Sequence, residues 1–312
     1  MSEPLVYLNG NLIPASRANI AIYDMGIIQG ATVTERLRTF NKEPFQVDAH
    51  LERLDQSLHH VRLDIGISID SLKHIIHELV NHNSKLVHPD DELNLVIFVT
   101  AGENSKFAAG SVSDFPSKPT ICVHTFRAHF GAWATPMQEG QHLVTPPTRH
   151  VPPQCYNPAI KNRSRFHFYM ADMEARDSDP DASALLLDIE GNITETSYAN
   201  FLLFRNGSMI SPTLRNILPG VSRKITIDLA AELGIPLLES DLQTSEAIEA
   251  EEAFLTSTSF CLMPVTRING SPIGTGKPGQ VYQKLLGAWN RRAGLDIHRQ
   301  ITEGARRHRQ EV

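Results

Sequence analysis

Three Asn-Gly pairs, each lying between two short apolar segments, constrain the fold of this 312-residue chain more than any other feature. They are Asn9-Gly10, Asn206-Gly207 and Asn269-Gly270. Asn-Gly is typical of two-residue hairpin turns, in which both central residues need a positive φ. The sequence therefore predicts three antiparallel hairpins, one at the start of the chain and two in its second half.

Apolar residues recur with helical spacing between these hairpins. Residues 51–61 and 72–80 each carry such a stripe, and a third predicted helix ends just before Gly234, which is placed as its C-terminal glycine. Residues 279–295 predict the last helix of the core. Strands come in groups and helices intervene irregularly, so we expect an α+β fold rather than a doubly wound sheet.

Prolines suggest where the chain divides. Residues 131–157 contain five prolines and few periodic apolar positions, which is typical of a linker. We therefore expect a small N-terminal α+β domain over residues 1–130 and a larger C-terminal α+β domain over residues 158–295. The basic, polar residues 296–312 are expected to form a solvated tail.

Composition and charge exclude several classes of protein. The formal net charge of −6 argues against a nucleic-acid partner, and no apolar run reaches the ~20 residues of a membrane helix. The N-terminus lacks the pattern of a signal peptide. Cys122, Cys155 and Cys261 are odd in number and far apart, and His77 and His82 are five residues apart, where two metal ligands on one helical face need four. We expect a cytoplasmic protein with no metal site.

Lys161 has an unusual position. It precedes by about one turn a helical stripe formed by Phe166, Tyr169, Met170 and Met173, which we expect to pack on the core. Taken alone, Lys161 is more simply interpreted as a solvated charge, because exposed lysines are common. A chemical role depends on the groups that the rest of the chain supplies.

Three downstream features supply such groups. Glu195 lies within a predicted strand and shares a face with Ile193, so its carboxylate lies either at a wet edge or beside a cationic partner. Val221 and Ser222 begin a helix just after a Pro-Gly pair, and the free N–H groups of such an end bind anions. Residues 256–259 place four hydroxyl groups at the end of an apolar strand.

Together with Lys161, these features match the needs of a pyridoxal 5′-phosphate enzyme: an amine for the aldehyde, a carboxylate that keeps the ring nitrogen protonated, and a cup for the phosphate. The chain also resembles the class IV aminotransferases, the fold-type-IV pyridoxal phosphate enzymes, over roughly residues 5–290. The matching blocks include "DMGIIQGATVTERLRTF", "HLERL", "LLLDIEGNITETSYANFLLF", "ILPGVSR" and "EEAFLTSTSFCLMPV".

The resemblance implies a role for each matching residue. Lys161 corresponds to the Schiff-base lysine, and Glu195 corresponds to the partner of the pyridine nitrogen. The phosphate cup implied by the resemblance consists of Arg53, Val221, Ser222 and Thr258. The implied architecture is two α+β domains that share one cofactor, usually in a homodimer.

Departures from the family pattern concern the substrate. Branched-chain members carry a tyrosine where this chain has Phe166, and a Tyr-x-Arg motif where it reads Glu92-Leu93-Asn94. Ala101 replaces the arginine of D-amino-acid members, whereas Arg165 is reminiscent of some lyases. We expect a branched-chain-type aminotransferase that moves an amino group to a 2-oxo acid. An aminodeoxychorismate lyase, a D-amino-acid or amine transaminase, and a non-catalytic binding protein that retains the fold are the alternatives.

Overall fold

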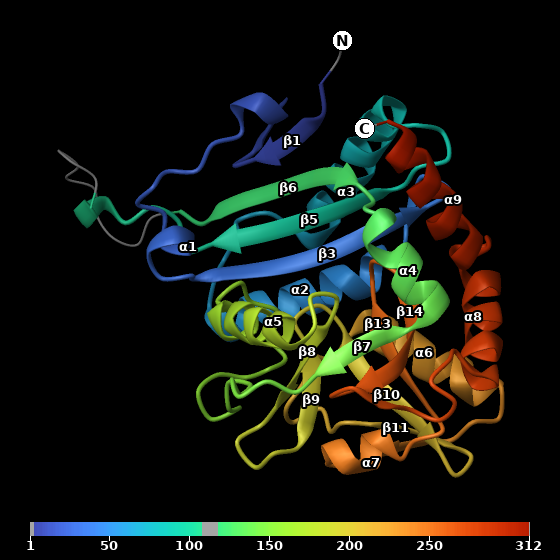
Figure 1. Ribbon diagram of the computed structural model, residues 1–312. Coiled ribbons are helices and arrows are strands. Elements are labelled where there is room, and N and C mark those ends of the chain that lie inside the picture. Colours follow the sequence, from blue (N-terminus) through green and yellow to red (C-terminus); the bar gives the residue numbers. More distant parts are fainter. Residues whose placement is uncertain (1–2, 108–117, 312) are drawn as a thin grey trace. The chain divides into compact units, whose positions relative to one another are not determined.

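The computed structural model describes residues 3–107 and 118–311 (Figure 1). The chain forms two compact units, Met1–Ala128 with Ile160–Ser164 and His129–Ala159 with Arg165–Val312. Both units combine helices with mostly antiparallel strands, as expected for an α+β fold. The segment that contains Lys161 belongs to the first unit, in contrast to the expected C-terminal domain, because it pairs with a strand of that unit.

Within the described residues, the first unit contains a six-stranded sheet in the order β2-β1-β6-β5-β3-β4, and its strand pairs are all antiparallel. Its elements are β1 (Leu5–Leu8), β2 (Asn11–Pro14), η1 (Ala15–Arg17), α1 (Met25–Ile28), β3 (Thr32–Phe40), β4 (Glu43–Pro44), α2 (Val47–Val61), α3 (Ile69–Asn83), η2 (Ser84–Leu86), β5 (Leu93–Thr100), η3 (Ser105–Phe107) and β6 (Thr120–Arg127).

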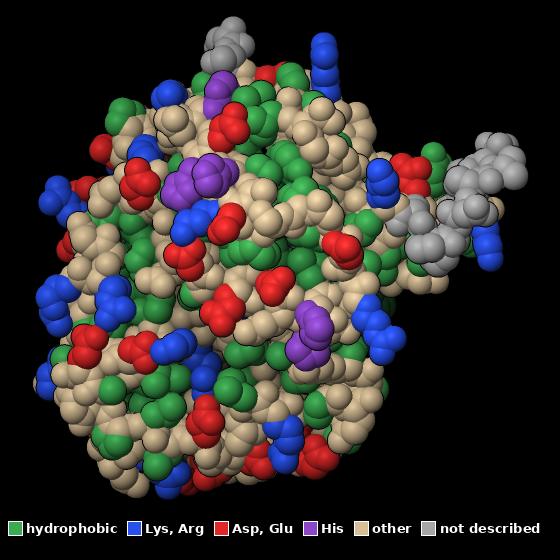
Figure 2. Space-filling view, turned by 180° about the vertical axis from the view of Figure 1, so that it is seen from behind, with side chains coloured by type: hydrophobic (Ala, Val, Ile, Leu, Met, Phe, Trp, Pro, Cys, Tyr) green, Lys and Arg blue, Asp and Glu red, His purple; other side chains and the backbone are tan. Residues whose placement is uncertain are grey.

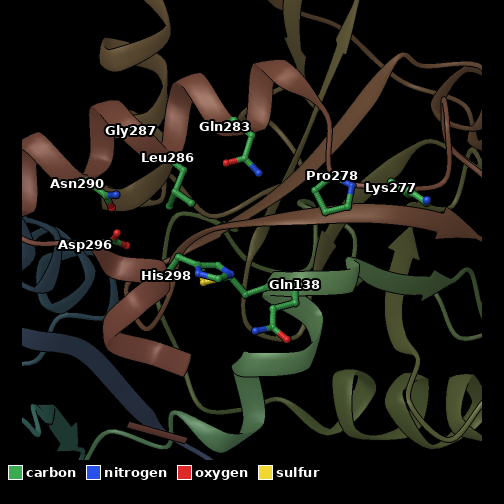
Figure 3. Close-up of a pocket in the computed structure, with 10 residues that line it drawn as sticks. Gln138, Lys277, Pro278, Gln283, Leu286, Gly287, Asn290, Asp296 and His298 are labelled. Atoms are coloured by element: carbon green, nitrogen blue, oxygen red, sulfur yellow. The ribbon is translucent and has the colours of Figure 1, made fainter. Parts of the chain in front are cut away.

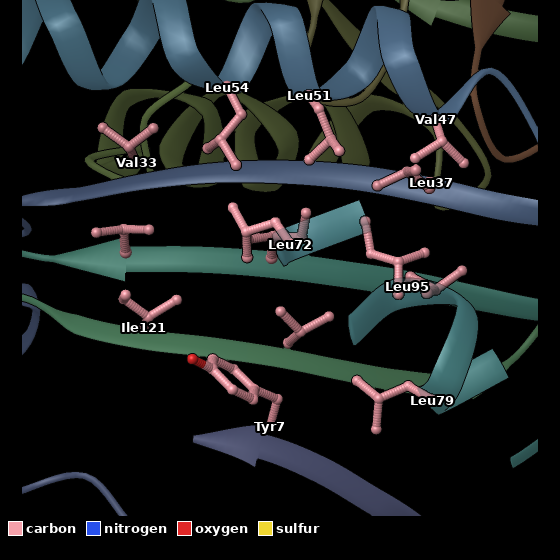
Figure 4. Packing of buried hydrophobic residues seen from close by; sticks show 14 of the residues in the cluster. Tyr7, Val33, Leu37, Val47, Leu51, Leu54, Leu72, Leu79, Leu95 and Ile121 are labelled. Carbon is pink, nitrogen blue, oxygen red and sulfur yellow. The ribbon is translucent and has the colours of Figure 1, made fainter. Parts of the chain in front are cut away.

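The core of the first unit lies between one face of this sheet and helices α2 and α3 (Figure 4). The predicted stripes at 51–61 and 72–80 supply its helical side, and Val33 and Leu37 of β3 supply part of its sheet side. Because side chains alternate along a strand, Arg36 lies on the opposite face of the sheet from Val33 and Leu37. The core face of this sheet is therefore mainly apolar, whereas the opposite face carries the basic residue Arg36.

The sheet of the second unit has nine strands within the described residues. Six of them, β10-β13-β14-β7-β8-β9, close into a ring because β9 pairs back onto β10 through Glu195 and Asn200. The elements are α4 (Gly131–Glu139), β7 (Gln141–Val144), α5 (Phe166–Ser178), β8 (Ser183–Leu187), β9 (Ile193–Thr196), β10 (Asn200–Arg205), β11 (Ser208–Ser211), α6 (Val221–Glu232), β12 (Leu237–Glu239), α7 (Thr244–Ile248), β13 (Glu252–Ser257), β14 (Cys261–Ile268), β15 (Ser271–Pro272), α8 (Gln280–Ala293) and α9 (Ile297–Gln310).

The three hairpin predictions are confirmed. The Asn-Gly pairs join β1 to β2, β10 to β11 and β14 to β15, and in each pair both residues have a positive φ. At the first turn these angles are 48° for Asn9 and 92° for Gly10. The predicted C-terminal glycine is confirmed as well, since Gly234 follows α6 with a φ of 74°.

Residues 131–157 do not form a simple linker. They contain α4 and β7, and β7 lies inside the ring of the second unit, parallel to both β14 and β8. Pro136 is accommodated within α4. The prediction failed because both elements are short and their apolar residues gain their partners only from distant parts of the chain.

The expectation that the C-terminal residues form a solvated tail is also wrong. Residues Ile297–Gln310 form helix α9, in which Ile297, Ile301, Gly304 and Ala305 are buried along one face. A Cβ at Gly304 would lie 2.2 Å from Cδ2 of Phe130, so the helix approaches that ring closely. Burial of this narrow apolar face stabilises a helix whose other faces are polar and basic.

Helix α5 forms where expected but buries a different face. Phe168, Ala171 and Ala175 are buried, whereas Phe166 and Tyr169 of the predicted core stripe are exposed. Small alanines allow α5 to pack closely on β8. All four residues of the predicted core stripe, Phe166, Tyr169, Met170 and Met173, are therefore exposed.

The surface carries charges of both signs. On the face shown in Figure 2, basic and acidic side chains are interspersed rather than gathered by sign. Among residues 3–107 and 118–311, no helix has the length and apolar character to cross a membrane.

We predict that Ile301→Ala lowers the free energy of unfolding by about 2–4 kcal/mol, because a fully buried side chain is replaced by a cavity. Arg306→Ala, on the exposed face of the same helix, is the control and should change it by less than about 0.5 kcal/mol. Denaturant unfolding of both variants measures the difference. Equal stabilities would mean that α9 does not contribute to the core.

Candidate functional site

Lys161 is fixed by the backbone of β3. The N–H of Thr34 donates to the carbonyl of Lys161 at 2.8 Å, and the N–H of Arg163 donates to the carbonyl of Thr32 at 3.0 Å. From α2, the hydroxyl of Ser57 accepts the N–H of Lys161 at 3.2 Å. The edge of β3 is open here because β4 pairs only with the last two residues of β3. A short segment remote in sequence therefore occupies this part of the edge.

A buried ion pair lies on the core face of β3. The carboxylate of Glu35 accepts hydrogen bonds from Nη2 of Arg53 at 2.6 Å and from Nε of Arg53 at 3.0 Å. Nδ1 of His50 lies 3.0 Å from the same carboxylate. Burial raises the pKa of Glu35, but the charge of Arg53 and the hydrogen bond from His50 outweigh it, so this pKa lies well below its ordinary value.

Arg53 is therefore not a solvated surface residue. It is 7% exposed on α2, and two of its guanidinium nitrogens bind Glu35 in a bidentate arrangement. Burial is the main cause of a lowered pKa at neighbouring His50, and the charges of Arg53 and Lys161 lower that pKa further. Lys161 thus lies within electrostatic range of this group, in the same unit.

Glu195 is buried in the second unit, so the wet-edge alternative is wrong. Its Oε2 accepts hydrogen bonds from Nδ2 of Asn200 at 2.9 Å and from the N–H of Leu218 at 3.3 Å. Its Oε1 has Nε2 of His150 nearby, at 3.7 Å, beyond ordinary hydrogen-bond length. The charge of Glu195 also raises the pKa of Arg165, although burial dominates and lowers it. One oxygen of this carboxylate is thus engaged and the other can accept a further donor.

Gly220 permits this arrangement. A Cβ on Gly220 would lie 2.0 Å from Oδ1 of Asn200, so only glycine allows the amide to reach Glu195. Gly220 is also the N-cap residue of α6, and no side chain caps that helix within the described residues. Val221 and Ser222 follow it in the first turn. The backbone N–H groups and the dipole of this helix end favour an anion.

Buried hydroxyl groups connect α6 to the neighbouring strands. Nε1 of Trp289 donates to Oγ1 of Thr226 at 3.0 Å, and Oγ1 of Thr226 lies 3.2 Å from Oγ1 of Thr256. Thr256 donates in turn to the carbonyl of Cys261 at 2.9 Å. This network fixes the start of α6 relative to the turn between β13 and β14, where Thr258 is half-buried.

The predicted site residues thus fall into two groups. The first unit holds Lys161 and Arg53, and the second unit holds the others, which are Glu195, Val221, Ser222 and Thr258. Sequence reasoning missed the residues that hold these in place, which are Glu35, His50, Asn200 and Gly220. All four lie in the matching blocks of the resemblance, which was the signal available for them.

The second unit has a surface pocket of about 600 Å³ (Figure 3). The C-terminal part of α4, the turn before α8, α8 itself and the start of α9 supply its lining. It contains none of the six predicted site residues, so it is not the candidate site.

The family model described as amino-transferase class IV matches residues 32–268, which include all six predicted site residues. The chain belongs to the class IV aminotransferases. These enzymes use pyridoxal 5′-phosphate, so the expected family, transaminase class and cofactor are confirmed.

Similar proteins cover nearly the whole of this class IV aminotransferase. The branched-chain-amino-acid aminotransferase of Pseudomonas aeruginosa is 26% identical and covers 92% of each chain. The aminodeoxychorismate lyase of Bacillus subtilis is 26% identical over 85% of this chain and 86% of its own. A solved structure of the branched-chain aminotransferase from Thermoproteus uzoniensis, with norvaline, has a TM-score of 0.82 at 23% identity and covers 94% of this chain and 95% of its own. The fold expected from the resemblance is therefore confirmed.

We predict that Gly220→Ala raises the dissociation constant of pyridoxal 5′-phosphate at least about tenfold, because the added methyl group displaces Asn200 and removes a donor from Glu195. Gly131→Ala is the control, since a Cβ there meets no atom of the described residues within 4 Å. Titration of the apoenzyme with the cofactor, followed by fluorescence, compares the two variants. A dissociation constant shared by both would exclude this role of Gly220.

Proposed function

We propose that this class IV aminotransferase is of the branched-chain type and moves the amino group of an amino acid to a 2-oxo acid, with 2-oxoglutarate as the first acceptor to test. The similarity to a branched-chain enzyme over 92% of both chains supports the substrate class. The buried Glu195, with one carboxylate oxygen engaged and the other able to accept a donor, is the observation that carries the chemistry.

The residues present fit pyridoxal 5′-phosphate. Oε1 of Glu195 can accept a proton donor such as a protonated ring nitrogen, and the negative charge favours that protonated form. The uncapped N-terminus of α6, with Val221 and Ser222, suits a phosphate group. From the family resemblance we assign phosphate-binding roles to Arg53 and to the hydroxyl of Thr258, and Glu35 holds the guanidinium of Arg53 in place.

When bound, the cofactor supplies an electron sink for negative charge at the α-carbon of the substrate. Lys161 supplies the amine that binds the cofactor and then moves the proton of that carbon. The hydrogen bonds from its backbone to β3 and Ser57 limit the movement of the main chain, so only the side chain has to reposition between these tasks. Glu195 would favour the protonated form of the ring nitrogen.

We predict that Lys161→Ala abolishes turnover while the free energy of unfolding changes by less than about 1 kcal/mol, because the backbone bonds of residue 161 remain and no core cavity forms. Product formation from a branched-chain amino acid and 2-oxoglutarate is measured with the holoenzyme. Lys106→Ala, an exposed lysine of the first unit, is the control. Turnover by Lys161→Ala at the rate of the control would refute the assignment.

The lyase alternative is tested with aminodeoxychorismate in place of the branched-chain amino acid, because elimination needs a substrate that carries a leaving group. A transaminase forms the 2-oxo acid repeatedly only when an acceptor is present, whereas a lyase needs no acceptor.

We also propose that the enzyme is a cytoplasmic homodimer. On α5, Phe166, Tyr169, Met170 and Met173 expose 72%, 63%, 41% and 45% of their surface, an apolar row of the kind that subunit contacts cover. All three cysteines are free, which suits a reducing compartment. Sedimentation equilibrium of the purified protein tests the oligomeric state, and a monomer at micromolar concentration would contradict the proposed homodimer.

A further inference from the structure

The face of the first-unit sheet opposite α2 and α3 contains an arginine with an unusual environment. Arg36 of β3 lies beside β5, where its Nη2 donates to Oδ1 of Asn94 at 3.3 Å. Its guanidinium carbon lies 5.3 Å from the centre of the Phe126 ring of β6. The side chain is therefore held in one orientation across three neighbouring strands.

Two donors in this contact have no acceptor. Nε of Arg36 and Nδ2 of Asn94 are buried and form no hydrogen bond within residues 3–107 and 118–311. Asn94 is only 1% exposed. A buried donor without an acceptor destabilises a fold, and here two of them occur in side chains that touch. A bound group that supplies acceptors would give Nε of Arg36 and Nδ2 of Asn94 the hydrogen bonds that they lack.

The charges around Arg36 favour an anion. Burial, followed by repulsion from Arg163 and Arg38, lowers the pKa of Arg36 to about 10. Burial and then Arg163 likewise lower the pKa of His124 on β6. No carboxylate of the described chain forms an ion pair with Arg36, since Glu35 on the same strand lies on the other face with Arg53. Arg36 thus lies within electrostatic range of other cationic groups, which favours an anion beside it.

Lys161 lies on the same face as Arg36. In the pairing with β3, Asn162 is opposite Val33, so Lys161 is opposite Thr34 and its side chain alternates to the face of Thr34 and Arg36. Residues diagonal to each other across two strands are about 7–8 Å apart, which is the relation between Lys161 and Arg36. A group bound by Arg36 thus lies on the face of the sheet that the side chain of Lys161 shares.

We propose that Arg36 and Asn94 bind a carboxylate group of the amino acid and of the 2-oxo acid, which makes Arg36 a specificity-determining residue. This inference rests on the proposed function, because it concerns the substrates of that reaction. A carboxylate provides acceptors for Nε of Arg36 and Nδ2 of Asn94 and compensates the charge of the guanidinium. The group is either the α-carboxylate of every substrate or the distal carboxylate of a dicarboxylic substrate.

The test uses the holoenzyme and two carboxylates that do not react, 4-methylpentanoate and glutarate, whose binding is followed through the absorbance of the bound cofactor. Arg36→Gln removes the charge and keeps a polar side chain, and Arg17→Gln, an exposed arginine of the same unit, is the control. We expect the dissociation constants in Arg36→Gln to rise by about 10- to 100-fold. Weaker binding of both probes identifies the α-carboxylate, and weaker binding of glutarate alone identifies the distal carboxylate.

Asn94→Asp is a second, independent variant. It places a permanent carboxylate beside Arg36, so it should weaken binding of the same probe at least about tenfold although the arginine is still present. A merely structural Arg36 predicts the reverse, namely a higher melting temperature with unchanged binding. The melting temperatures of all variants confirm that each is folded.

Failure of this inference is distinguishable from failure of the proposed function. Dissociation constants in Arg36→Gln and Asn94→Asp that match the Arg17→Gln control would overturn the inference, even if the wild-type enzyme transaminates. A wild-type enzyme that binds neither carboxylate would overturn it as well. A wild-type enzyme that binds the probes but forms no 2-oxo acid would instead refute the proposed function.

Discussion

The pairing of residues 161–163 with the open edge of β3 is the interaction on which the rest of the site depends. Two hydrogen bonds flank the contact between Val33 and Asn162, and Ser57 supplies a third from α2. Through alternation along both segments, this register places Lys161 and Arg163 on the face of Arg36. If residues 161–163 paired with β3 one residue out of register, the side chains of Lys161 and Arg163 would lie on the opposite face of the sheet. The register of one short segment therefore decides what the lysine can reach.

The buried carboxylates of Glu35 and Glu195 differ in how many of their acceptor positions the fold already uses. Arg53 and His50 surround Glu35, so its charge is compensated within the fold and fixes the guanidinium. Among residues 3–107 and 118–311, donors reach Glu195 on one oxygen only, and they are Nδ2 of Asn200 and the N–H of Leu218. A carboxylate whose oxygens already accept hydrogen bonds from the protein stabilises the fold. A carboxylate with one oxygen free of such donors can also accept a hydrogen bond from a bound molecule. This difference in hydrogen bonding distinguishes the two residues more clearly than their burial does.

The turns and one helix end of this fold could be predicted from short stretches of the sequence. The Asn-Gly turns and the helix end at Gly234 depend on backbone angles that few residues adopt, so their positions could be read from the sequence. Helix α9 and strand β7 could not be predicted from the sequence, because each is stabilised by residues far away in the chain. Gly304 of α9, for example, packs closely against Phe130. The exposed row on α5 was mistaken for a core face for a similar reason. Periodicity shows that an apolar face exists but not which surface covers it.

The candidate site likewise contains residues that the sequence predicted and residues that it did not. Lys161, Glu195 and the start of α6 were predicted from chemistry and from matching blocks, since those residue types suit the cofactor directly. The residues that position them were not predicted, because Asn200 acts on Glu195 across a strand pair and Gly220 acts through a close approach to Asn200. Arg36 was missed for the same reason: its significance comes from Asn94 on another strand.

The most direct measurement of the central claim is the rate of a single turnover in a Glu195→Gln variant. The swap keeps the size of the side chain and removes the charge, so the cofactor should still bind while the ring nitrogen loses its protonated form. The absorbance of the bound cofactor is followed after mixing with saturating amino acid and no acceptor, with Glu190→Gln, at an exposed position in the same hairpin, as the control. We expect the rate to fall by at least about two decades, equivalent to about 2.7 kcal/mol of transition-state stabilisation. A rate equal to that of the control would remove Glu195 from the reaction and contradict the account.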